Sequence, residues 1–116
     1  MILALPCPYF IPPRQCLADP ASVDAEMVRL CCEPGYARGR CERFPADSIA
    51  DSARFVVARD EDGIIEVRWG LELNHEPVDT GTLRYPSEKL ADAAMQRQAE
   101  TAAEAYLARK AKWRKN

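Results

Sequence analysis

Apolar and polar residues alternate most regularly in the middle of the chain, between Gly63 and Asn74. An apolar run, Arg54–Ala58, precedes this segment, and Asp62-Gly63 lies between the two, as is typical of a two-residue hairpin turn. The pattern predicts an antiparallel hairpin over about residues 53–74. Its buried face would carry Ile65, Val67, Trp69, Leu71 and Leu73. We expect a third strand at 82–85, after a turn through 79–81.

A long helix is predicted from Ser87 to about Trp113. Ser87 follows Pro86 and is a good N-cap, and the acidic Glu88 and Asp92 favour the positive end of a helix. Helical spacing gives this segment one apolar stripe, made of Ala91, Met95, Ala99, Ala102, Tyr106 and Trp113. The stripe can cover the apolar face of the hairpin. The predicted fold class is therefore α+β, a small antiparallel sheet covered by a long C-terminal helix.

The N-terminal part of the chain has a different character. All five cysteines and seven of the nine prolines lie at or before residue 45. Prolines in residues 1–20 exclude a regular helix there and favour extended or turn structure. A short helix is predicted from about Ser22 to Cys32, with a buried stripe of Val23, Met27, Leu30 and Cys31. This phase makes Cys31 a packed thiol and directs Cys32 into the following loop.

The chain length of 116 residues predicts a single domain, 1–116, with one hydrophobic core. We divide it into a metal-binding loop region at 1–45 and a hairpin plus long helix at 46–116. The net charge of −2 argues against general attraction to nucleic acid or to anionic membranes. The apolar start, Met1–Leu5, has no basic residue before it and is interrupted by Pro6, so we expect neither an export signal nor a membrane span. A cytoplasmic location is predicted, where cysteines are reduced thiols or metal ligands.

The cysteines predict a metal centre. Their order is Cys7-x8-Cys16, then Cys31-Cys32, then Cys41. The predicted ligands are Cys7, Cys16, Cys32 and Cys41, with Cys31 as the alternative to Cys32. Four thiolates are the usual ligand set of a [4Fe–4S] cluster, and the aromatic residues after Cys7 can exclude water from it. Zinc is the alternative cofactor, although structural zinc sites usually take ligands in pairs two to four residues apart. A disulfide or free buried thiols are further alternatives.

The loop between Cys32 and Cys41 is the predicted cluster environment. Glycine amides can approach the sulfur atoms and arginines can compensate the charge of an anionic cluster, and a solvated loop face is the equal alternative. The predicted cluster environment consists of Tyr36, Arg38, Gly39 and Arg40, and Arg43 after the loop is a further arginine that can compensate the charge. The pattern Cys32-x2-Gly35-Tyr36-Ala37-x-Gly39-x-Cys41-x2-Phe44-Pro45 resembles a segment of small uncharacterised cysteine-rich bacterial proteins. The resemblance implies a shared metal-site motif and no particular activity.

Other polar residues receive structural interpretations. His75 is expected in a polar turn, residues 60–62 in a solvated hairpin turn, and the basic residues 109–115 at a helix C-terminus. No motif for catalysis is present, so enzyme activity has no positive evidence. The predicted function is electron transfer with a redox partner protein, or sensing of oxidant or nitric oxide. The alternatives are a zinc-stabilised protein interaction module and an accessory subunit of a redox enzyme.

Overall fold

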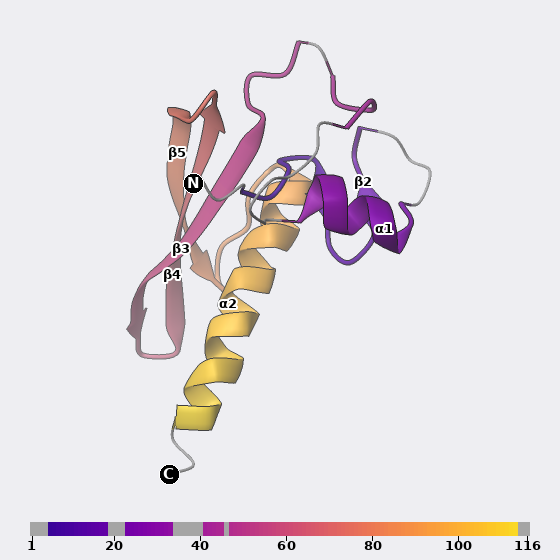
Figure 1. Ribbon diagram of the computed structural model, residues 1–116. Helices are drawn as coiled ribbons and strands as arrows, with labels where there is room; N and C mark the ends of the chain where they lie inside the picture. Colours follow the sequence, from indigo (N-terminus) through magenta and orange to yellow (C-terminus); the bar gives the residue numbers. More distant parts are fainter. Residues whose placement is uncertain (1–4, 19–22, 34–40, 46, 114–116) are drawn as a thin grey trace.

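The computed structural model describes residues 5–18, 23–33, 41–45 and 47–113 (Figure 1). The chain forms an α+β fold, as predicted, with a three-stranded antiparallel sheet and a long C-terminal helix. Its elements in order are β1 (Phe10–Ile11), β2 (Gln15–Cys16), α1 (Ala25–Met27), the π-helical turn η1 (Val28–Cys32), β3 (Ser52–Glu61), β4 (Ile64–Leu73), β5 (Glu76–Tyr85) and α2 (Ala93–Trp113).

The larger sheet has the order β3-β4-β5 and is joined by two tight turns. Asp62 and Gly63 have φ of 53° and 77°, and Asn74 and His75 have φ of 52° and 70°. Two consecutive positive φ values define the type I′ turn, whose twist matches that of the flanking strands. The predicted hairpin is therefore confirmed, and His75 lies in a turn as expected.

The third strand is longer than predicted, and the predicted turn at 79–81 is wrong. Asp79, Thr80 and Gly81 pair with β4 inside β5, where Gly81 lies opposite Trp69. The chain has already reversed at Asn74-His75, so no further turn is needed. Trp69 and Gly81 form a close contact in the middle of the sheet, where the indole ring occupies the space that a side chain at position 81 would need.

Helix α2 begins six residues later than predicted. The side chain of Asp92 accepts a hydrogen bond from the Met95 amide at 2.9 Å, as an N-cap residue does. Ser87 is held outside the helix, because the Glu88 amide donates to the Arg84 carbonyl at 2.7 Å and the Glu88 carboxylate accepts the Arg84 amide at 2.8 Å. These two hydrogen bonds hold residues 84–88 in a turn at the end of β5.

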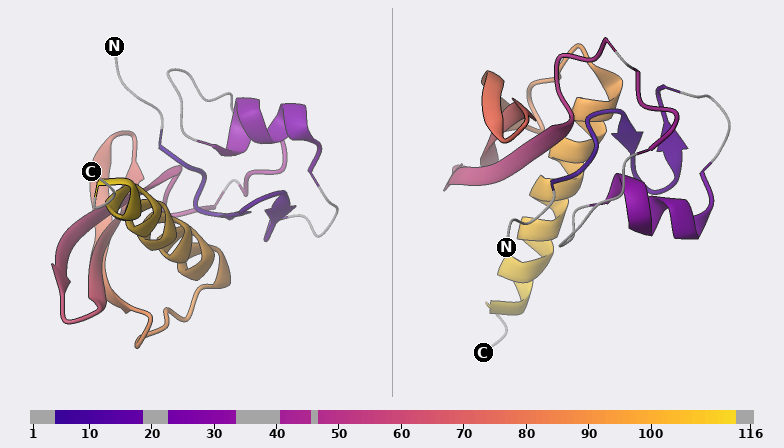
Figure 2. Two further views of the ribbon diagram at one scale, coloured as in Figure 1. Left: turned by 90° about the horizontal axis from the view of Figure 1, so that it is seen from below. Right: turned by 45° about the horizontal axis from the view of Figure 1, so that its top comes forward.

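Two clusters of buried residues replace the single predicted core. In the first, α2 covers the sheet with Ala99 and Ala103, which pack on Ile65, Val67 and Leu83. Met95 and Ala99 of the predicted stripe are buried, whereas Trp113 is 62% exposed and Ala91 precedes the helix. The second cluster belongs to the cysteine-rich half and contains Cys7, Phe10, Val23, Val28 and Cys32. Figure 2 shows α2 between the sheet on one side and the β1, β2 and α1 segments on the other.

The short helix before the candidate site differs from the prediction in length and phase. Asp24 caps it by accepting the Met27 amide at 2.8 Å, and Ser22 lies outside the described residues. After one α-helical turn the chain widens into η1, which ends with the Glu33 amide bonded to the Val28 carbonyl at 2.9 Å. The wider turn directs Val28 and Cys32 inward and leaves Leu30 44% exposed. Of the predicted stripe, Val23 is buried and Met27 and Cys31 are partly buried against the same cluster, so the prediction is wrong at Leu30.

Candidate metal centre

All five cysteines line one cavity, although 34 positions separate Cys7 from Cys41 in the sequence. The four predicted ligands and the alternative, Cys31, are therefore brought into one site. The remaining wall is largely aromatic and apolar. The lining residues in the described part of the chain are Cys7, Tyr9, Phe10, Cys16, Ala18, Cys31, Cys32, Cys41, Arg43 and Phe44.

Backbone hydrogen bonds hold the first part of the site together. Cys7 begins a turn that is closed by the Phe10 amide and the Cys7 carbonyl at 3.1 Å. The Cys7 amide donates to the Cys32 carbonyl at 3.0 Å, which joins this turn to the end of η1. Cys16 lies in β2 opposite Phe10 of β1. Three cysteines thus belong to one network of main-chain contacts.

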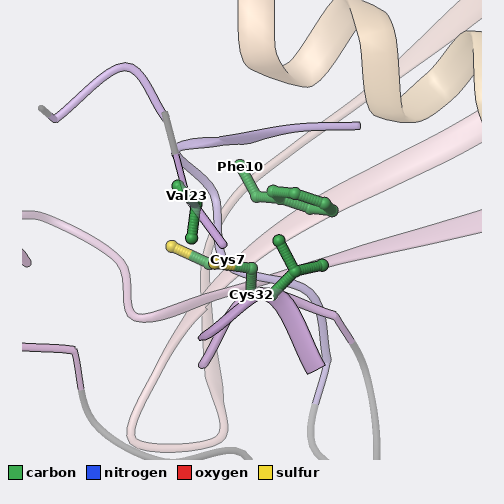
Figure 3. Packing of buried hydrophobic residues seen from close by; sticks show 5 residues of the cluster. Cys7, Phe10, Val23 and Cys32 are labelled. Carbon is green, nitrogen blue, oxygen red and sulfur yellow. The ribbon is translucent and has the colours of Figure 1, made fainter. Parts of the chain in front are cut away.

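The link between β2 and η1 is fixed by Arg14. Its side chain donates from Nε to the Val23 carbonyl at 2.9 Å, and its own carbonyl accepts the Val23 amide at 3.1 Å. Val23 is buried against the cysteine cluster. The proline-rich turn therefore lies against the segment that leads into α1, as Figure 3 shows for Val23 beside Cys7 and Phe10.

Cys41 enters the cavity from a separate loop. The Arg43 amide lies 3.4 Å from Cys41 Sγ, which accepts its hydrogen bond, and the Phe44 amide donates to the Cys41 carbonyl at 3.1 Å. An amide that donates to sulfur stabilises a thiolate and tunes the potential of a metal bound to it. Arg43 also lines the cavity, and it is the one arginine predicted to compensate cluster charge that lies within the described residues.

An aromatic contact connects the Cys41 loop to the Cys7 turn. The rings of Tyr9 and Phe44 pack edge to face with their centroids 5.4 Å apart. The Tyr9 hydroxyl donates to Ser48 Oγ at 2.9 Å, and Ser48 donates in turn to the Ala50 carbonyl at 2.6 Å. Tyr9 therefore joins two segments that both supply cysteines to the cavity.

The thiols differ in exposure. Cys7 and Cys32 are each 6% exposed, whereas Cys16, Cys31 and Cys41 are half-buried. Burial raises the pKa of Cys32 to about 12, and negative charge on the other four thiols contributes in the same direction, most of all that on Cys7. Cys32 is accordingly a protonated thiol in the metal-free protein at neutral pH. Any metal that binds it must displace this proton.

The described thiols do not meet at one point. Within residues 5–18, 23–33, 41–45 and 47–113, no three His, Cys, Asp or Glu side chains converge as the ligands of one metal ion do. Tyr36, Arg38, Gly39 and Arg40, the predicted cluster environment, lie outside the described residues.

Sequence reasoning missed Gln98 as a residue that supports the site. Gln98 Nε2 donates to the carbonyls of Cys7 and Phe10, at 2.7 and 2.8 Å, from the middle of α2. The only sequence signal was a polar residue between Met95 and Ala99 on a face that is otherwise small and apolar.

Two charged segments away from the cavity behave differently from the prediction. Asp60 does not lie in a solvated turn: it belongs to β3, accepts the Tyr106 hydroxyl at 2.9 Å and pairs with Lys110. Part of the basic C-terminal segment is therefore used to hold α2 against the sheet. His75 is exposed in its turn and is not among the residues that line the cavity.

The chain matches no protein-family model, no curated protein and no solved structure. The resemblance of residues 32–45 to small cysteine-rich bacterial proteins therefore stays a prediction. Among the described helices, none is both long enough and apolar enough to cross a membrane. The function must accordingly be argued from the chemistry of the cavity.

Proposed function

We propose that this protein binds an iron–sulfur cluster through Cys7, Cys16, Cys32 and Cys41, and exchanges electrons with a redox partner protein or senses oxidants. The observation that carries the proposal is the single cavity lined by five cysteines from separate segments. Four thiolates are the common ligand set of a [4Fe–4S] cluster. A bound cluster would supply one-electron chemistry that thiols alone do not have.

The cavity wall supports a redox centre. Tyr9, Phe10 and Phe44 surround the thiols with aromatic surface, which lowers water access and so affects the potential of a cluster. The Arg43 amide donates to Cys41 Sγ, a contact that favours a metal-bound thiolate. Half-burial of Cys16 and Cys41 would leave one edge of the cluster close to solvent, where a partner can exchange electrons.

The spacing of the cysteines favours a cluster over a single zinc ion. Structural zinc sites usually take their ligands in pairs separated by two to four residues, and the cysteines of this chain form no such pair.

A zinc-stabilised interaction module is the second candidate. In its described residues, the cysteine-rich half has two very short strands and little helix, yet it has its own group of buried side chains. Such a segment gains much of its stability from a structural metal.

Anaerobic purification tests the proposal directly. We expect a brown protein that contains iron and acid-labile sulfide, with broad visible absorption that dithionite bleaches. Replacement of Cys41 by Ser should remove most of the iron, whereas His75→Ala, a change in an exposed turn that does not line the cavity, should retain it. A colourless folded protein with one zinc ion per chain would overturn the proposal and support the interaction module.

A further inference from the structure

Cys7 and Cys32 are joined by their backbones as well as by the cavity. The Cys7 amide donates to the Cys32 carbonyl at 3.0 Å. With ordinary backbone bond lengths, one such hydrogen bond holds the two Cα atoms within about 7 Å of each other. Disulfides usually span Cα separations of about 4.4–6.8 Å, so the backbone contact is compatible with a bridge between this pair.

The side chains of the two residues share one environment. Both line the cavity, and both are buried in the cluster that contains Phe10, Val23 and Val28. Figure 3 shows Cys7 and Cys32 beside each other among the labelled residues of this cluster. The two side chains are therefore packed within one buried cluster.

The adjacent cysteine is a poorer partner for Cys32. Consecutive Cα atoms are about 3.8 Å apart, which is below the usual disulfide range, so a Cys31–Cys32 bridge would be strained. Cys16 pairs with Phe10 in the small sheet, and Cys41 is held in its own turn by the amides of Arg43 and Phe44. The backbone contact with Cys32 thus distinguishes Cys7 among the other thiols.

We propose that Cys7 and Cys32 form a disulfide when the metal-free protein is oxidised, so that the cavity acts as a dithiol–disulfide switch. With hydrogen peroxide, one thiol is first oxidised to a sulfenic acid and one water is released. The second thiol then displaces the hydroxyl group as another water, and the S–S bond forms. The two thiols together lose two electrons, and one molecule of hydrogen peroxide gains them and becomes two molecules of water.

The consequence for the metal site rests on the proposed function. Cys7 and Cys32 are the two buried members of the proposed ligand set, and a thiol in a disulfide is not a metal ligand. Oxidation would therefore block cluster binding until a reductant reopens the pair. The disulfide and the cluster are two exclusive states of one cavity.

Disulfide mapping of the wild-type protein tests the pairing without any substitution. The metal-free, reduced protein is treated with hydrogen peroxide, alkylated in denaturant and digested with trypsin without reductant. Trypsin separates the cysteines into peptides 1–14, 15–29, 30–38 and 41–43. We expect a linked 1–14/30–38 peptide as the main product, with Cys16 and Cys41 alkylated. A main product that links Cys16 or Cys41, or oxidation without an intramolecular disulfide, would overturn the proposal.

Two further measurements assign the pair and separate this proposal from the preceding one. Cys31→Ser should keep the linked peptide, and Cys32→Ser should lose it; the reverse result would transfer the disulfide to Cys31. Oxidised wild-type protein should take up at least tenfold less iron and sulfide than reduced protein, and dithiothreitol should restore uptake. If the reduced protein also fails to bind iron, the cluster proposal fails, while the peptide map still decides the disulfide.

Discussion

The side-chain amide nitrogen of Gln98 lies 2.7 Å from the carbonyl oxygen of Cys7 and donates a hydrogen bond to it. A second bond, to the Phe10 carbonyl at 2.8 Å, uses the other proton of the same amide. Gln98 is only 5% exposed and projects from α2, the helix that covers the sheet. A single polar side chain thus connects the sheet and helix to the turn that begins with a proposed metal ligand.

Replacement of Gln98 by Met is predicted to weaken the cysteine-rich half. Methionine has a similar length but no donor, so two carbonyl groups would lose their buried partner, at a cost of about 1–3 kcal/mol in the free energy of unfolding. Urea unfolding measures this loss, and limited proteolysis should show earlier cleavage before Pro45. Thr101→Ala, an exposed position on the same helix, is the control and should change neither. Equal protease resistance of wild type and Gln98→Met would contradict the role given to Gln98.

Local sequence signals predicted the sheet better than the helices. Asp62-Gly63 carries the turn residues that a type I′ hairpin needs. On the buried face predicted for β4, Ile65 and Val67 are buried and Trp69 and Leu71 are half-buried, whereas Leu73 at the end of the strand is 38% exposed. His75 was expected in a turn, but the third strand was placed only at 82–85, because Asp79-Thr80-Gly81 also carries turn residues. The reversal at Asn74-His75 accounts for the full length of β5.

The helix boundaries depended on competition between candidate caps. Ser87 and Asp92 both suit an N-cap. The sequence does not reveal that Glu88 forms a hydrogen bond with Arg84 that keeps Ser87 in a turn, so that Asp92 is the residue that caps the helix. The π turn was equally invisible, since its wider register changes which of Leu30 and Cys32 is buried. The five cysteines that count and spacing single out all line the cavity. Their grouping depends on non-local bonds such as that between Cys7 and Cys32, which no periodicity encodes.

Replacement of Gly81 by Ala is predicted to disturb the centre of the sheet. A Cβ atom at Gly81 would lie 2.3 Å from Cζ2 of Trp69, so the indole ring must move. Overpacking of this kind costs about 1–3 kcal/mol. Thermal unfolding and tryptophan fluorescence measure the effect. Gly70→Ala is the matched control, because its nearest contact would be Cγ2 of Thr80 at 3.7 Å, an ordinary packing distance. Similar stability of the two variants would show that the Trp69 ring moves without cost.

Replacement of Asp92 by Ala is predicted to destabilise α2 at its start. The variant loses the side-chain bond to the Met95 amide, and loss of an N-cap costs about 1 kcal/mol in the free energy of unfolding. Ser87→Ala should cost less, because Ser87 makes only an exposed bond to the Arg84 carbonyl at 3.2 Å. Urea unfolding of both variants makes the comparison. A larger loss at Ser87 would return the helix start to the position expected from sequence.

The buried thiol of Cys32 gives the metal-free protein a predicted pH dependence. Burial raises its pKa from 9.0 to about 12, so between these values the unfolded chain has lost the proton that the folded chain retains. The unfolded state then binds fewer protons, and the free energy of unfolding must fall as pH rises through this window. Below pH 9 the contribution is fully present.

The measurement is urea unfolding of the reduced, metal-free protein at several pH values from 8 to 11. Lysine and tyrosine also titrate in this range, so the informative quantity is the difference between wild type and Cys32→Ser. We expect this difference to shrink as pH rises above 9, because the variant lacks the titrating thiol. A difference that stays constant to pH 11 would indicate that Cys32 is not held protonated by burial.

The adjacent cysteines should differ in their contribution to the metal centre. Cys32 is buried at the cavity and its carbonyl is bonded to the Cys7 amide, so its thiol is fixed beside another proposed ligand. Cys31 lines the same cavity but is half-buried. Cys31 packs against the buried cluster as predicted, but the stripe that was expected to hold it fails at Leu30, so the preference for Cys32 depends on its burial and on its bond to Cys7. Cys32→Ser should therefore lose most of the iron and sulfide of the anaerobic protein, while Cys31→Ser should retain them with slightly lower stability. Iron content and visible absorption measure both variants, and loss of the cluster only in Cys31→Ser would assign the ligand to Cys31.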